Sequence, residues 1–107
     1  EADNVKAVAV QFVASLPTAT ATACGLLAPE TLRVFEESEG PCVSALPTST
    51  DATSGPVKSV DVYGKDAMVH LSTDTLFLAR FAQGWRVTAA GCTRQPERPY
   101  DCTVSGG

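Results

Sequence analysis

The spacing of the apolar residues changes halfway along the chain, and this change constrains the fold more than any other feature. Before Pro47 the apolar residues recur every three or four positions, which is the period of an amphipathic helix. After Pro56 they recur at every second position, which is the period of a strand with one buried face. Helices followed by strands predict the α+β class, with the helices packed against one face of an antiparallel sheet.

Three helices are predicted in the first half of the chain. The first is capped by Asp3 and ends at Pro17, and a short second helix falls within 18–27. The third begins at Pro29, because a missing N–H is harmless in a first helical turn. The apolar stripe of the first helix consists of Val5, Val8, Ala9, Phe12, Val13 and Leu16.

Four strands are predicted in the second half. They cover 57–63, 67–72, 75–81 and 85–89, and the short connections between them indicate an antiparallel meander. The stretch 47–56 contains no large apolar side chain, so we expect a flexible surface loop there. Neither half is long enough to stand alone, and we therefore expect residues 1–107 to form a single domain.

The four cysteines contain no Cys-x-x-Cys pair, which disfavours zinc binding and thioredoxin chemistry. In a domain this small, they favour two disulfides over four buried thiols, and hence an exported protein, extracellular or in the cell envelope. Three connectivities are possible. We expect Cys24 to pair with Cys42 because both lie in one local segment. The same reasoning pairs Cys92 with Cys102, which would tether the C-terminal tail 93–107 as a loop.

The charge of the chain narrows the possible partners. It is −4 overall, with only eight Lys and Arg residues that form no patch, which argues against nucleic acid and against an anionic membrane surface. No run approaches the roughly 18 apolar residues of a membrane span. The sequence opens at Glu1 without a basic or apolar leader, so we expect any targeting segment to have been removed. Whether a lipid or helical anchor precedes Glu1 in the full protein is left open by the sequence.

The order of elements, together with the strand start Gly84-Trp85-Arg86-Val87, resembles the nuclear transport factor 2 superfamily, also called SnoaL-like or cystatin-like. The resemblance covers about residues 3–92. It implies a cone built from helices and a curved sheet, whose mouth binds small apolar molecules. Enzymes of this superfamily, such as ketosteroid isomerases and polyketide cyclases, place Asp, His or Tyr inside the cone. The cysteine-bearing segments resemble those of short exported actinobacterial proteins, which implies export but no reaction.

The candidate site residues lie on the predicted strands. His70 is the only histidine, and as a general base it would need a carboxylate within reach, for which Asp61 on the neighbouring strand is the best placed. A partly exposed structural histidine is the simpler interpretation. Trp85 is a candidate stacking platform for a ligand, although a lone Trp on a strand face is more often core. Tyr63 completes the set of candidate ligand-binding residues.

The remaining motifs exclude several chemistries. The glycines are scattered singly and no serine lies in a nucleophile elbow, so we expect no nucleotide site and no serine catalysis. The third helix ends in an acidic cluster that consists of Glu36, Glu37 and Glu39. This cluster is either a solvated helix end or a site for a cation or a partner, and the spacing of its residues favours the solvated helix end. We predict no cofactor and no metal. The sequence predicts a non-enzymatic module that binds a small molecule or a protein, with an isomerase- or cyclase-type enzyme using His70 and Asp61 as the alternative.

Overall fold

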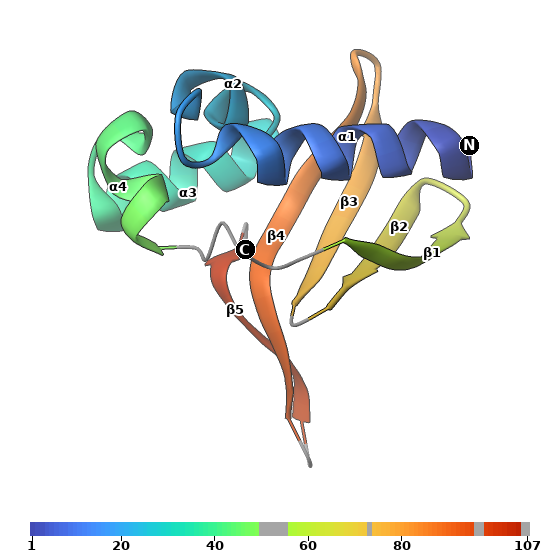
Figure 1. Cartoon of the computed structure of the whole chain (residues 1–107). Coiled ribbons are helices and arrows are strands. Elements are labelled where there is room, and N and C mark those ends of the chain that lie inside the picture. Colours follow the sequence, from blue (N-terminus) through green and yellow to red (C-terminus); the bar gives the residue numbers. More distant parts are fainter. Residues whose placement is uncertain (50–55, 73, 96–97, 106–107) are drawn as a thin grey trace.

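The computed structural model describes residues 1–49, 56–72, 74–95 and 98–105, which form four helices followed by a five-stranded antiparallel sheet (Figure 1). The helices are α1 (Ala2–Ser15), α2 (Thr20–Gly25), α3 (Pro29–Glu39) and α4 (Cys42–Ser49). The strands are β1 (Val57–Tyr63), β2 (Asp66–Leu71), β3 (Thr75–Phe81), β4 (Gly84–Gln95) and β5 (Arg98–Ser105). They follow one another across the sheet in chain order. The predicted α+β class, with helices packed on an antiparallel meander, is confirmed.

Helix α1 lies across one face of the sheet (Figure 1). Its predicted stripe is directed into the core, where Val5, Ala9 and Phe12 are fully buried. The predicted cap is wrong by two residues, because Glu1 occupies the N-cap position and Asp3 lies in the first turn. A carboxylate in the first turn still interacts favourably with the positive end of the helix dipole.

The segment between α2 and α3 joins the helical layer directly to the sheet. The backbone of Val87 donates to Leu26 O at 2.8 Å and accepts from Ala28 N at 2.8 Å, as a parallel strand would. Thr31 is buried and donates its hydroxyl to Thr88 O at 3.0 Å. Strand β5 pairs with β4 only from Ala89 onward. The segment between α2 and α3 therefore occupies the edge of β4 beside Val87, where β5 does not pair.

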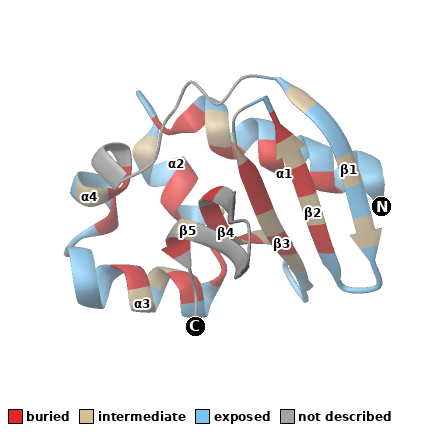
Figure 2. Cartoon of the chain, turned by 90° about the horizontal axis from the view of Figure 1, so that it is seen from below, coloured by how far each residue is buried: buried red, intermediate tan, exposed pale blue. Residues whose placement is uncertain are grey.

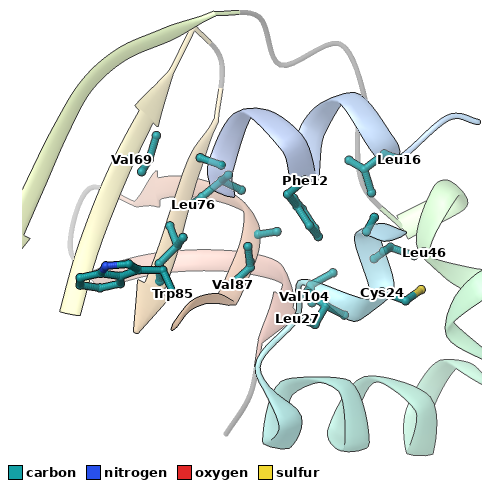
Figure 3. Close-up of a cluster of buried hydrophobic side chains, with 14 of the residues drawn as sticks. Phe12, Leu16, Cys24, Leu27, Leu46, Val69, Leu76, Trp85, Val87 and Val104 are labelled. Carbon is teal, nitrogen blue, oxygen red and sulfur yellow. The ribbon is translucent and has the colours of Figure 1, made fainter. Parts of the chain in front are cut away.

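The space between the helices and the sheet is filled by side chains (Figure 3). Trp85 is only 3% exposed and belongs to this core. The largest fully buried hydrophobic side chains come from α1 and its C-cap, from α4 and from four strands: Phe12, Leu16, Leu46, Leu78, Val5, Val69, Val87 and Val104. The interior that the superfamily resemblance associates with a ligand therefore holds the packed core.

Helix α4 corrects the predicted loop 47–56. The helix continues through Pro47 to Ser49, and the rest of the predicted loop, 50–55, lies outside the described residues. The helix forms because Cys42 and Leu46, four residues apart, are both buried on one helical face. Its N-terminus is also fixed to α2 by the predicted bond between Cys24 and Cys42, whose S–S distance is 2.11 Å.

The C-terminal tail is the second correction. Residues 93–107 were expected to form a tethered loop, but β4 continues to Gln95 and β5 returns beside it. The predicted disulfide between Cys92 and Cys102 is present, with an S–S distance of 2.07 Å, and the two cysteines face each other across the strands. Val104 on β5 is fully buried. Backbone pairing and this core contact make the segment a strand.

Candidate functional site

The predicted pair His70 and Asp61 lies on the face of the sheet that α1 does not cover. Along β2, Val69 and Leu71 are buried in the core, so the alternating residues Met68 and His70 face the other side. This outer face is half-exposed to exposed along β1 and β2 (Figure 2). The sheet therefore holds the only histidine of the chain outside the packed interior.

The structure brings the His70 imidazole between two oxygen atoms. Its Nε2 lies 3.5 Å from Asp61 Oδ2, and its Nδ1 lies 3.4 Å from the hydroxyl of Thr75. Both distances exceed the usual 2.7–3.2 Å of a protein hydrogen bond to nitrogen. The imidazole is 32% exposed and the carboxylate 48% exposed. The carboxylate named as the best-placed partner of His70 thus lies near the imidazole, and the two form a loose, solvated pair.

The other two candidate ligand-binding residues do not join this pair. Trp85 lies in the core, where its Nε1 is 3.4 Å from the Glu1 carboxylate, so the interpretation as an open stacking platform is wrong. Tyr63 is 61% exposed and pairs with Asp66 at the turn end of the first hairpin. His70 pairs with Ser59, towards the opposite end of that hairpin, so these candidates do not converge on one site.

An apolar groove opens elsewhere, between α1 and the start of β1. Its volume is about 270 Å³, and every residue that lines it is apolar: Ala9, Val10, Val13, Ala14, Pro17, Pro56, Val57 and Leu71. Leu71 reaches the groove on the helix side of β2, whereas the neighbouring His70 faces the outer side. The sheet therefore separates the groove from the imidazole and its carboxylate.

Sequence reasoning missed this groove because its walls come from segments that are far apart along the chain, at 9–17, 56–57 and 71. One feature of the sequence could have indicated the groove. Val10 lies outside the predicted core stripe of the first helix, and it is 49% exposed in the structure. An exposed apolar residue beside a buried stripe extends the apolar surface of the helix beyond what the core covers.

Two of the three glutamates at the acidic end of α3, Glu36 and Glu37, make hydrogen bonds within the chain. Arg33 bonds to the carboxylates of Glu30 and Glu37, and its hydrogen bond to Glu30 holds the pKa of that carboxyl below the ordinary value. Glu36 accepts a hydrogen bond of 2.9 Å from the backbone N–H of Cys42, the first residue of α4. Among the described residues, no group of three or more His, Cys, Asp or Glu side chains is arranged to hold a metal ion.

The contact of Glu36 with α4 gives a measurable expectation. Replacing Glu36 with alanine leaves the first N–H of α4 without this acceptor and should lower the free energy of unfolding by about 1 kcal/mol, as loss of a helix cap does. Urea unfolding followed by tryptophan fluorescence measures the change. Glu39→Ala, at an exposed position of the same helix end, is the control and should change stability by less than about 0.5 kcal/mol. Equal effects of the two substitutions would contradict the capping role.

None of the helices in the described part of the chain combines the length and the apolar content of a membrane span. No family model, curated protein or solved structure matches this chain.

Proposed function

We propose that this chain is an exported, non-enzymatic binding module of the nuclear transport factor 2-like type, which holds a small apolar ligand in the groove between α1 and β1. The observation that carries the proposal is the composition of the groove, since all the residues lining it are apolar. Ligand pockets in proteins are concave and mostly apolar, and their few polar groups fix orientation. This lining supplies contact area and no reacting group.

The position of His70 argues against catalysis on a ligand bound in the groove. A general base must lie within hydrogen-bond reach of the proton that it abstracts, either directly or through one water. His70 and Asp61 face the opposite side of the sheet from the groove. The core between the helices and the sheet is packed with apolar side chains, and neither His70 nor Asp61 belongs to it.

The two disulfides support the exported part of the proposal. Cys24–Cys42 joins two helices and Cys92–Cys102 joins two strands, so no cysteine of the chain is free. Disulfides form and persist in oxidising compartments, and small exported domains use them to supplement a small core. This support comes from the sulfur chemistry together with the small size of the domain.

A charge placed in the groove tests the proposal. Val10→Asp puts a carboxylate among apolar lining residues, and it should weaken binding of the neutral fluorophore N-phenyl-1-naphthylamine by about tenfold or more, because a charge beside a bound apolar molecule must be desolvated. Fluorescence titration measures the affinity. Val43→Asp is the matched control, since Val43 is also an exposed helical valine, at 57% exposure, and does not line the groove.

Three outcomes separate the candidate functions. Loss of binding in Val10→Asp and normal binding in Val43→Asp supports the groove as the site. Equal loss in both variants contradicts it. Loss of binding in His70→Ala with full binding in Val10→Asp would move the site to the outer face and would favour the enzyme alternative.

A further inference from the structure

Two lysines lie close in the sequence to residues that line the groove. Lys6 precedes Ala9 by three residues and Val10 by four, which places it one turn away on the same side of the helix. Lys58 directly follows the lining residue Val57, where the pairing of β1 with β2 is irregular between Val57 and Ser59, so strict alternation does not assign Lys58 to the outer face. Both lysines are exposed, and neither forms an ion pair with the described part of the chain.

These two charges oppose the charge of the chain as a whole. The chain has twelve acidic and eight basic residues, yet no carboxylate lines the groove. Two of the nearby acidic groups are engaged elsewhere, because Glu1 bonds to Arg80 and Asp61 contacts the imidazole on the outer face. Asp3 lies on α1 one turn beyond Lys6 and further from the groove. Two exposed lysines that form no ion pair with the described residues therefore adjoin, along the chain, residues that line the groove.

We propose that the groove binds a free long-chain carboxylate, with the aliphatic chain along the apolar lining and the carboxylate beside Lys6 and Lys58. This proposal rests on the proposed function and names the ligand class of the same site. The volume of about 270 Å³ lies just below the range usual for drug-sized ligands, so one flexible chain fits better than a fused ring system. Each methylene that the lining buries should tighten binding roughly fourfold.

Three ligands with the same chain and different headgroups test the charge preference: dodecanoate, dodecanol and dodecyltrimethylammonium. Isothermal titration calorimetry at pH 8 should show dodecanoate binding about fivefold to tenfold tighter than dodecanol, and the cation binding most weakly. Lys6→Glu and Lys58→Glu should each weaken dodecanoate binding by about fivefold and leave dodecanol unchanged, since exposed charge pairs contribute up to about this factor. Lys65→Glu is the control, because Lys65 is exposed in the turn between β1 and β2 and away from the groove.

The outcomes separate this inference from the proposed function. Equal affinity for dodecanoate and dodecanol, with no effect of Lys6→Glu or Lys58→Glu, would overturn the carboxylate preference while the groove remains an apolar site. No binding of dodecanol would overturn the groove itself. Lysine-dependent sedimentation with phosphatidylglycerol vesicles, without binding of free dodecanoate, would identify a lipid headgroup as the source of the anion and would also overturn the proposal.

Discussion

Replacing Phe12 with alanine should lower the free energy of unfolding by about 3–5 kcal/mol. Phe12 is fully buried in the C-terminal half of α1, between that helix and the sheet (Figure 3). Its removal takes away the transfer free energy of the ring and leaves a cavity that a packed core closes only in part. A domain of this size has about 5–15 kcal/mol of total stability, so the expected loss is a large share of it.

Urea unfolding followed by the fluorescence of Trp85 measures this loss, because Trp85 is buried in the same core and becomes exposed on unfolding. Gln11→Ala is the control at the adjacent, exposed position of the helix and should change stability by less than about 0.5 kcal/mol. A loss below about 1 kcal/mol for Phe12→Ala would mean that α1 does not pack on the sheet as described. If the variant does not fold at all, Phe12→Leu provides a milder change whose loss should still exceed that of the control.

Removing the disulfide between Cys24 and Cys42 should cost about 3 kcal/mol. The bond closes a loop of 18 residues and so restricts the unfolded chain. It also fixes α4 to α2 through two buried sulfur atoms, and the short helix α4 has little stability of its own. The double variant Cys24→Ala, Cys42→Ala in urea unfolding gives the value directly.

The second disulfide provides the comparison. Cys92 and Cys102 face each other in strands that are also joined by backbone hydrogen bonds, and their separation of 10 residues is shorter. Chain entropy predicts a loss of about 2.7 kcal/mol for this pair, slightly below that for Cys24 and Cys42. A loss under 1 kcal/mol for Cys24→Ala, Cys42→Ala would contradict the role of that bond as a principal constraint on the helical layer.

The strands were predicted better than the helices because their signal is local. Strand-like runs at 57–63 and 75–81, each bounded by turn residues, gave the observed bounds of β1 and β3. Helix α4 was missed because Leu46, the large buried residue among its described side chains, precedes a proline in a stretch of small and polar residues. Its stability depends on the disulfide and on the acceptor from Glu36, both of which are tertiary contacts.

Strand β5 and the groove were missed for the same reason. The segment Arg98–Ser105 shows no clear alternation, and it forms a strand because β4 and the disulfide hold it in register. The groove exists only when α1 lies beside β1, so its lining has no local pattern. The sequence names Asp61 as the best-placed carboxylate for His70, and the structure holds the two side chains 3.5 Å apart on neighbouring strands of one hairpin.

Side-chain NMR during a titration with dodecanol tests the account most directly, because it shows where on the molecule the ligand binds. We predict that the methyl resonances of Val10, Val13 and Leu71 shift together with a single affinity, while the imidazole resonances of His70 stay unchanged. Shifts of the His70 imidazole with unmoved groove methyls would contradict the account and would place the binding site on the outer face of the sheet.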